Sequence, residues 1–261
     1  MNEHVWYGRI PVELHGHRKK LDFFLDELDR FTRDCGRDRA DISILEIGCS
    51  NGRNVSLPLA ERGYDITGVD LHEPSIDWAN ENNSFANARF ICRDAAEFQS
   101  ERTFDVVVLS DILEHVSDPL QLLELARSLI GEGGMVLICI PNGFGPGEIE
   151  RKVVEVTRLD RVLYALRVSI NRLRRRHSVP YNEDSGHIQY FRMSTISRLI
   201  ERAGFTIERR GKGALFGGGV TYPLGMFFPR LAGVSLECAN RLPFWMISTW
   251  YFSLGRTRSK A

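Results

Sequence analysis

Apolar residues recur at two different spacings along the first 142 residues, and the alternation between these spacings predicts the fold. Three- and four-residue intervals predict an amphipathic helix over Leu21, Phe24, Leu25, Leu28 and Phe31. Continuous apolar runs bounded by polar or glycine-containing turns then predict strands over 42–48, 65–70, 88–94, 104–111 and 134–142. Helical patterns separate these runs, and this alternation predicts a parallel, doubly wound α/β sheet.

Proline and aspartate indicate where two of the helices begin. Pro58 lies in the helical segment 54–64, so we expect it in the first turn or at a kink. Asp118 followed by Pro119 is typical of an N-cap and the first helical residue. A helix around 196–203 and a strand over 205–211 follow.

These patterns divide the chain into five predicted segments. They are an N-terminal helical arm (1–40), the α/β core (41–142), a basic cap insertion (143–185), the end of the core sheet (186–222) and an apolar, aromatic-rich tail (223–261).

Charge and cysteine content exclude several classes of protein. Lys+Arg and Asp+Glu both number 34, so the whole chain has no polyelectrolyte partner. The segment 151–177 is an exception, because it holds nine basic and two acidic residues. It lacks the interleaved aromatic residues of single-strand nucleic-acid sites, so nucleic acid is not the expected partner. The five cysteines form no metal-like pair, and the N-terminus lacks the apolar core of a signal peptide, so we expect a cytoplasmic protein.

The loop in "ILEIGCSNGRN" is a candidate ligand site, because open α/β sheets bind ligands beyond the carboxyl ends of their strands. Gly48 and Gly52 let the backbone approach a ligand closely. A dinucleotide site would need G-x-G-x-x-G, whereas the spacing here is G-x-x-x-G and Glu46 would repel a pyrophosphate. This acid suits a ligand that carries ammonium and sulfonium groups. Asp70 and Asp94 end the next two strands, where carboxylates can accept hydrogen bonds from ribose hydroxyls and an adenine amino group.

Five motifs resemble, in order, those of class I S-adenosylmethionine-dependent methyltransferases: "LEIGCSNGRN", "GVDLHEP", "RDAAEF", "FDVVVLSDILEHVSDP" and "IGEGGMVLICIPN". The stretch "GHIQYFRMSTISRLIERAGFTI" resembles the small-molecule branch of that superfamily, which includes ubiquinone-biosynthesis O-methyltransferases. The resemblance implies a Rossmann-like sheet of seven strands, the last one antiparallel, and S-adenosylmethionine as the cofactor.

The same resemblance implies how the chain holds this cofactor. Glu46, Gly48 and Gly52 would hold the methionine part, Asp70 the ribose and Asp94 the adenine. The cofactor site would be completed by Cys49, Ser50, Leu71, Ala95 and Ser110.

The segment "SDILEHVSDP" follows the fourth strand, where an acceptor would meet the methyl group. Transfer to a hydroxyl requires alignment and removal of a proton, so His115 is the candidate base and Glu114 its catalytic neighbour. A structural alternative remains, since Asp111-x-x-Glu114 is also typical of a capping box and His115 could pack over the loop.

A metal site is a second hypothesis for this segment. The i, i+3, i+4 spacing would present Asp111, Glu114 and His115 together on one helical turn. In ubiquinone O-methyltransferases and small-RNA 3′-end methyltransferases, a similar acid-x-x-Glu-His motif and a distant histidine bind a divalent metal. The resemblance therefore implies that His187 completes a site for a cation such as Mg²⁺. Those families usually have Glu where this chain has the shorter Asp111.

The C-terminal tail contains an apolar run of about 10–11 residues, too short to span a membrane. Its Trp, Phe and Tyr residues are typical of an interfacial segment, but a dimer interface or a buried final strand pair explains them equally well. Together with the basic segment, the interfacial interpretation favours an anionic membrane surface and a lipid-linked acceptor.

We therefore expect an enzyme, an S-adenosylmethionine-dependent methyltransferase that acts on the oxygen of a small or lipid-linked metabolite. It would be cytoplasmic, or peripheral at the inner membrane face. The alternatives are transfer to nitrogen, carbon or an RNA terminus, and a non-catalytic methyltransferase fold that serves as a binding subunit. The intact Glu46, Gly48, Gly52, Asp70 and Asp94 argue against the last alternative.

Overall fold

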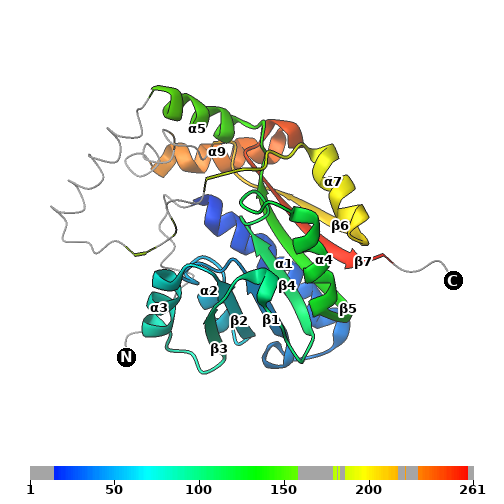
Figure 1. The fold of residues 1–261 in the computed structure, drawn as a ribbon. Coiled ribbons are helices and arrows are strands. Elements are labelled where there is room, and N and C mark those ends of the chain that lie inside the picture. The colour runs from blue at the N-terminus through cyan, green and yellow to red at the C-terminus, as the bar shows by residue number, and fades with distance from the viewer. Residues whose placement is uncertain are drawn as a thin grey trace.

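The computed structural model describes residues 15–157, 179–180, 182, 186–216, 221 and 229–257. Within these residues seven strands form one sheet in the order β3-β2-β1-β4-β5-β7-β6 (Figure 1). The strands are β1 (Ser43–Ile47), β2 (Asp65–Asp70), β3 (Ala88–Cys92), β4 (Phe104–Ser110), β5 (Ile130–Pro141), β6 (Phe205–Lys212) and β7 (Thr249–Arg256). Strand β7 is antiparallel to both of its neighbours, and β1 to β5 run parallel, which confirms the predicted fold class.

Helices cover both faces of the sheet (Figure 1). The helices are α1 (His15–Cys35), α2 (Ser56–Glu61), α3 (Glu73–Asn82), α4 (Pro119–Leu129), α5 (Pro146–Thr157), α7 (Met193–Arg202) and α9 (Pro229–Arg241), with short 3₁₀ turns η3 (Arg39–Asp41), η4 (Ala95–Glu97) and η5 (Phe244–Met246). Asp118 caps α4 by accepting from Gln121 N, and Pro58 lies in the first turn of α2, as the sequence predicts.

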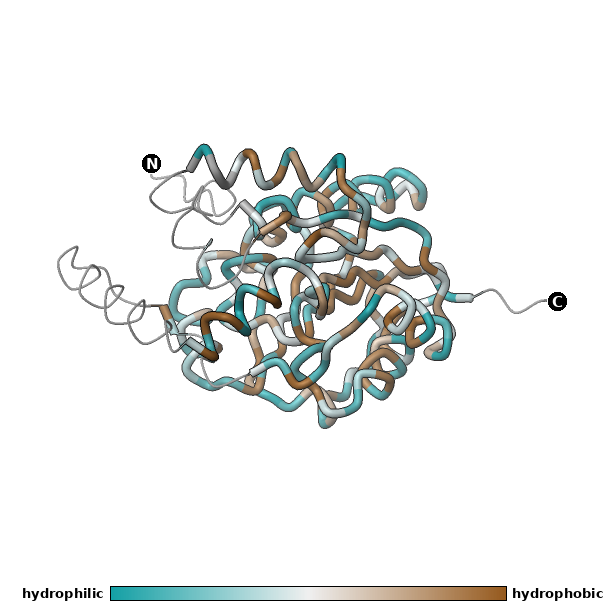
Figure 2. Tube along the Cα trace, turned by 90° about the horizontal axis from the view of Figure 1, so that it is seen from above, coloured by the Kyte–Doolittle hydropathy of each residue, from teal (hydrophilic) through white to brown (hydrophobic). Residues whose placement is uncertain are grey.

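Strand β4 shows why a continuous apolar run is needed at the centre of such a sheet. Val107 and Leu109 pack into one core cluster with α4 and α7, whereas Val106 and Val108 pack into another cluster with α1. Both faces of the strand are therefore buried. Figure 2 shows the hydrophobic stretches gathered along the strands in the middle of the molecule, with hydrophilic residues around them.

The interfacial interpretation of the C-terminal tail is wrong for residues 249–256, because they form strand β7 inside the sheet. Strand β7 pairs with β5 on one side and with β6 on the other. The aromatic residues Trp250, Tyr251 and Phe252 are buried by these strands and the helices over them. Their apolar character serves the core, as the alternative of a buried final strand pair predicts.

The cap insertion is described only in part. Helix α5 forms its first portion, and most of the basic segment 151–177 lies outside the described residues. No helix among the described residues is long and apolar enough to cross a membrane.

We expect truncation after Arg241 to unfold the protein, because β5 and β6 would both lose their partner strand in the interior of the sheet. A chain that ends at Thr257 keeps all of β7 and is the matched control. Circular dichroism with urea titration should show a cooperative transition for the control and none for the shorter chain. A folded, soluble protein that ends at Arg241 would contradict the structural role of β7.

Candidate functional site

The loop after β1 adopts a conformation that requires glycine at two positions. Gly48 and Gly52 have φ of 77° and 71°, in the left-handed region that side chains disfavour. A Cβ at Gly48 would collide with Ile112, and one at Gly52 would lie 2.7 Å from the Phe90 ring. The loop is held against β2 because Gly48 N donates to Val69 O at 2.8 Å. Both glycines therefore adopt the left-handed conformation that the sequence predicts for this loop.

Glu46 is a buried carboxyl group directly below this loop. Burial raises its pKa to about 8, although the hydroxyl of Ser56 donates to it and the positive charge of Lys20 acts in the opposite direction. The protein therefore holds Glu46 largely protonated at neutral pH. A cationic ligand beside Glu46 would stabilise its ionised form and offset part of the free-energy cost of burying that charge.

Asp70, at the end of β2, is fixed by the backbone of two loops. Its Oδ2 accepts from Ser50 N at 2.7 Å and its Oδ1 from His72 N at 2.8 Å. Each carboxylate oxygen has a second lone pair, so the pair can still accept from two hydroxyl groups. Leu71 follows with 65% of its surface exposed, which leaves an apolar side chain next to this acid.

Asp94 lies after β3 and is exposed. Its Oδ1 accepts from Ala96 N at 2.9 Å and caps the turn η4, which begins at Ala95. This contact explains part of why an acid follows the strand, and it still leaves acceptor capacity on the carboxylate. Cys49, by contrast, is buried against Phe90 and Ile76, where it packs as a small apolar residue.

Asp111 leaves β4 in a left-handed conformation, with φ of 54°. Its Oδ2 accepts from Lys20 Nζ at 2.7 Å, and Lys20 also donates to Ser110 Oγ at 2.8 Å. The thiol of Cys139 lies 2.9 Å from the other oxygen, Oδ1. Burial alone would raise the pKa of Asp111, but the Lys20 charge outweighs it and holds the pKa below its ordinary value.

The sequence prediction was wrong about the conformation around Asp111. Residues 113–115 form an isolated turn, in which His115 N donates to Ile112 O at 2.9 Å, so neither a helical turn over 111–115 nor a capping box is formed. Asp111 turns to Lys20 and lies outside the group formed by Glu114, His115 and His187. The Asp111 carboxylate pairs with the ammonium group of Lys20, on α1, and not with the two histidines.

Lys20 is a site residue that the sequence reasoning missed. It is buried on the apolar face of α1, one turn before Phe24 and next to Leu21. The sequence did hold a signal for Lys20, because a charged residue there interrupts the apolar face of the predicted helix. His17 lies one turn earlier, and burial together with the charge of Lys20 lowers its pKa to about 4, so His17 is neutral at this end of the helix.

Glu114, His115 and His187 form a compact cluster beyond β4. One ligand atom from each lies within 4.8 Å of the others, which confirms that the distant histidine approaches the motif. Glu114 is 1% exposed, and its Oε2 has no hydrogen-bond partner within the described part of the chain. Burial, then the nearby charge of Asp111, raises the pKa of Glu114 well above its ordinary value.

The two histidine rings meet edge to face, with centroids 4.8 Å apart. His115 Nδ1 is 3.2 Å from Gly186 O, so this nitrogen donates and Nε2 is left to accept. Burial lowers the pKa of His115, and the neighbouring His187 adds to this effect. His115 is therefore neutral at physiological pH and can take a proton.

Glu148 is the second residue that the sequence reasoning missed. It lies in the first turn of α5, and its Oε1 is 2.9 Å from His187 Nδ1. Arg151 donates twice to its Oε2, and the same guanidinium donates to Tyr190 Oη at 2.8 Å. Glutamates are common on exposed helices, so no pattern in the sequence distinguished this one.

Apolar and cationic side chains lie near the cluster. Phe144, Ile188 and Tyr190 are exposed. Lys152 Nζ lies 4.4 Å from the centre of the Tyr190 ring, and the Arg192 guanidinium lies 4.5 Å from that of Phe144. We call these five residues the aromatic–cationic rim.

The end of the cap insertion contacts the predicted cofactor loop. Pro180 O accepts from Asn51 Nδ2 at 2.9 Å and from Ser75 Oγ at 3.2 Å. The insertion therefore reaches both the loop after β1 and the start of α3.

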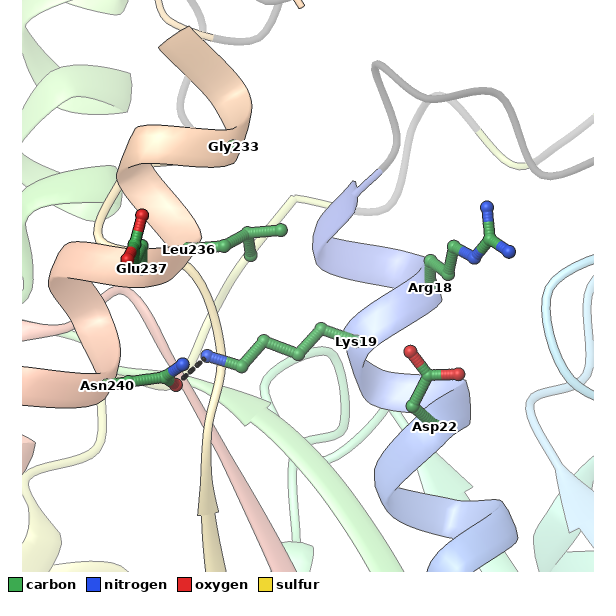
Figure 3. Close-up of a pocket in the computed structure, with 7 residues that line it drawn as sticks. All are labelled: Arg18, Lys19, Asp22, Gly233, Leu236, Glu237 and Asn240. Carbon is green, nitrogen blue, oxygen red and sulfur yellow. Dashed lines mark hydrogen bonds between the residues drawn. The ribbon is translucent and has the colours of Figure 1, made fainter. Parts of the chain in front are cut away.

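A separate hollow of about 340 Å³ lies between α1 and α9 (Figure 3). Lys19 spans it and donates to Asn240 Oδ1 at 2.7 Å and to Gly213 O at 3.0 Å. The remaining lining residues are Arg18, Asp22, Gly233, Leu236 and Glu237. None of the predicted site residues lines this hollow, so it is not the candidate site.

A family model described as a methyltransferase domain matches residues 15–209 of the chain. Among curated proteins, the ubiquinone biosynthesis O-methyltransferase of Rickettsia akari is 28% identical over 119 residues, which are 44% of this chain and 46% of that protein. The enzyme of the same name from Caulobacter sp. strain K31 is 31% identical over 131 residues, covering 47% of this chain and 51% of that protein. The chain thus matches about half the length of these relatives.

Solved structures of methyltransferases share the fold. An S-adenosylmethionine-dependent methyltransferase from Clostridium acetobutylicum superposes with a TM-score of 0.59 at 11% identity, over 93% of this chain and 92% of that one. The magnesium protoporphyrin IX methyltransferase of Synechocystis, solved with bound SAH, gives a TM-score of 0.54 at 16% identity, over 92% of this chain and 84% of that one.

We expect the two partners of the Lys20–Asp111 ion pair to differ in the cost of their removal. The Lys20 side chain is 4% exposed and that of Asp111 is 38% exposed. In Asp111→Asn, the new side chain tolerates the left-handed backbone. The buried ammonium of Lys20 loses its carboxylate, however, which lowers the free energy of unfolding by about 3 kcal/mol. Lys20→Met leaves an acid that water can solvate, at a cost of about 1 kcal/mol. Urea denaturation measures both, and equal costs would contradict the ion-pair analysis.

Proposed function

Because the chain belongs to the methyltransferase domain family, we propose that it transfers the methyl group of S-adenosylmethionine to a hydroxyl oxygen of a small or lipid-linked acceptor. The single observation that carries this proposal is the buried Glu46 beneath the Gly48–Gly52 loop, close enough to Asp70 for the two charges to interact. A carboxyl group kept out of water there favours a ligand with positive charge close to its methyl group.

The residues present fit this cofactor. The loop from Gly48 to Gly52 lies at the carboxyl end of β1, where the methionine part would bind, and Glu46 can attract its charged groups. The fixed carboxylate of Asp70 has lone pairs for two ribose hydroxyls, and exposed Leu71 offers an apolar contact to a sugar or base. Asp94 and Ala95 lie one strand further along, where they can reach the adenine.

The side chain of Ser110 is engaged within the protein. Its hydroxyl accepts from Lys20 and lies 3.2 Å from Asp111 Oδ2, so it supports the ion pair at the end of β4. We propose that any contact of Ser110 with the cofactor is made by its backbone, since the side chain is already engaged.

His115 is the proposed general base. In the transfer, a lone pair of the acceptor oxygen forms a bond to the methyl carbon, and the carbon–sulfur bond breaks with its electron pair going to sulfur. The hydroxyl proton moves to His115 Nε2, which is available because Nδ1 faces Gly186 O. Buried Glu114, whose Oε1 is 3.8 Å from Nε2, would stabilise the imidazolium that results.

The acceptor class follows from the aromatic–cationic rim and from the relatives. Exposed Phe144, Ile188 and Tyr190 favour an acceptor with an apolar, flat portion, and Lys152 and Arg192 favour one with an anionic group. The curated relatives carry the name ubiquinone biosynthesis O-methyltransferase, which supports oxygen as the acceptor atom.

A divalent cation is a second candidate for the same cluster, and Glu114 Oε2 favours it. This buried oxygen lacks a hydrogen-bond partner in the described residues, and a carboxylate with two imidazoles suits such an ion. Glu114, His115 and His187 would hold the cation, which when bound lowers the pKa of an acceptor hydroxyl. Asp111 would take no part, because Lys20 holds it.

We expect S-adenosylmethionine to bind more tightly as the pH rises from 6 to 7.5. The pKa of Glu46 is raised to about 8 in the protein alone. A cationic ligand stabilises the carboxylate, so binding must release the proton. The affinity for the ligand therefore rises with pH, by at most about tenfold per pH unit. Calorimetry in buffers of different ionisation enthalpy measures the released proton directly. Binding with no proton release at pH 6.5 would contradict the assigned role of Glu46.

We expect methyl transfer to survive exhaustive treatment with EDTA and to fall by about 10²–10⁴-fold in His115→Ala. The acceptor for this assay is found by incubating cell extract with isotopically labelled S-adenosylmethionine and identifying the labelled product by mass spectrometry. Elemental analysis of the treated protein checks that the metal is gone. If EDTA abolishes transfer while S-adenosylmethionine still binds, and Mg²⁺ restores it, the metal model replaces the base model.

A further inference from the structure

Lys19 links three elements at the carboxyl edge of the sheet. Its side chain leaves α1 and crosses the hollow between α1 and α9 (Figure 3). The nitrogen donates to Asn240 Oδ1 on α9 at 2.7 Å and to Gly213 O, just after β6, at 3.0 Å. Both acceptors are neutral, so neither holds a positive charge on this nitrogen as a carboxylate would.

A second lysine lies beside this contact. Lys212 ends β6, and its Nζ donates to Asn240 O at 3.2 Å and to Leu242 O at 2.6 Å. Asn240 therefore contacts both lysines, Lys19 through its side chain and Lys212 through its backbone. Two positive charges that meet at one neutral residue disfavour each other, and the pair favours the loss of one proton.

The charged groups around Lys19 come from three elements. Lys212 faces it from β6, Glu237 lines the hollow from α9, and Arg18 and Asp22 line it from α1 itself. Burial, and then the charge of Lys212, lower the pKa of Lys19 to about 8, so the two acids do not restore its ordinary value. About a quarter of such an amine is neutral at pH 7.5, against about 0.1% of an unperturbed lysine.

The contacts of Lys19 suit a neutral amine. A neutral amine has two N–H donors and one lone pair, and Asn240 Oδ1 and Gly213 O accept from both donors. The lone pair is then left for an electrophile that enters the hollow. The volume of the hollow, about 340 Å³, is ample for a small acyl donor.

We propose that Lys19 is a site of acylation, at which small acyl phosphates transfer their acyl group to the side-chain nitrogen. The nitrogen lone pair forms a bond to the acyl carbon, and the bond from that carbon to the phosphate oxygen breaks, its electron pair leaving with phosphate. The nitrogen then releases a proton to water, and an amide remains. Burial and a neighbouring cation are the conditions that activate lysine as a nucleophile. The proposal does not depend on methyl transfer.

The other lysines within the described residues lack one of these conditions. Lys20 is buried and paired with Asp111, whose charge outweighs the effect of burial and holds the pKa of Lys20 above its ordinary value. Lys152 is exposed and lies against the Tyr190 ring. Lys212 binds two backbone carbonyls and is not part of the lining of the hollow. Lys19 should therefore react first.

Acylation would weaken the contact between α1 and α9. The resulting amide has a single N–H, so the nitrogen can keep only one of its two hydrogen bonds, to Asn240 or to Gly213. The modification also removes the positive charge that repels Lys212. Since Lys20 is the next residue of α1, the loosened segment is the one that places Lys20 against Asp111.

The decisive experiment treats the full-length protein with acetyl phosphate between pH 6.5 and 9.5 and follows each lysine by mass spectrometry, with fragment spectra separating Lys19 from Lys20. At pH 7.5 we expect Lys19 to be acetylated about tenfold faster than Lys152, or more. The rate at Lys19 should rise about eightfold from pH 6.5 to 7.5 and less than about 1.5-fold from pH 8.5 to 9.5, because the neutral fraction saturates above a pKa of about 8.

Asn240→Asp tests the neutral contact at nearly constant shape. Its carboxylate would hold the positive charge on Lys19 and slow acetylation at pH 7.5 by about fivefold or more. Gln99→Glu is the matched control, because it adds the same charge at an exposed position beyond β3, at the edge of the sheet opposite β6. It should leave the rate at Lys19 unchanged.

Two results with the wild-type protein would overturn the proposal, even where Asn240→Asp fails to fold. One is acetylation of Lys19 no faster than that of Lys152. The other is a rate at Lys19 that still rises about tenfold between pH 8.5 and 9.5, as it would for an unperturbed amine. An unchanged rate at Lys19 in folded Asn240→Asp would overturn it as well.

Discussion

The ammonium of Lys20 organises the carboxyl edge of the sheet. It is buried against Ser110 and Asp111, and its charge also reaches Glu46. Its two partners stand at the end of β4, just before the turn that carries Glu114 and His115. It also ties α1 to the loops that follow the strands. The single charge of Lys20 pairs with Asp111, so Glu46 and Glu114 remain as buried acids whose pKa values are raised.

Those two acids mark the two halves of the proposed reaction. Glu46 lies under the loop that would hold a positively charged methyl donor. Glu114 lies beside two histidines that would receive a proton or bind a cation. The cap insertion connects the halves physically, because its start supplies Glu148 to His187 and its end places Pro180 against Asn51 and Ser75. In the proposed function, buried groups on both sides would face the donor and the acceptor without further loss of hydration.

The sheet and the conformation of the loop after β1 could be predicted from the sequence, because both depend on local patterns. Apolar runs and caps specify β4 and α4, and the spacing of Gly48 and Gly52 specifies the loop. The acceptor side could not, because its contacts join residues far apart in the chain: Lys20 with Asp111, and Glu148 with His187. The i, i+3, i+4 spacing misled for the same reason, since a distant lysine decides where Asp111 points. Aromatic content likewise could not distinguish a buried β7 from a membrane contact.

The central claim is that a buried acid at this edge attracts the charged methyl donor. Calorimetric affinity of Glu46→Gln for S-adenosylmethionine at pH 7.5 tests it most directly, with exposed Glu97→Gln as the control. The amide can accept from Ser56 as the acid does, so the variant should fold. We expect the affinity of Glu46→Gln to fall by about tenfold or more, in line with a charged hydrogen bond of about 1.5–3 kcal/mol, and the affinity of the control to match that of the wild type. Unchanged affinity in folded Glu46→Gln would contradict it.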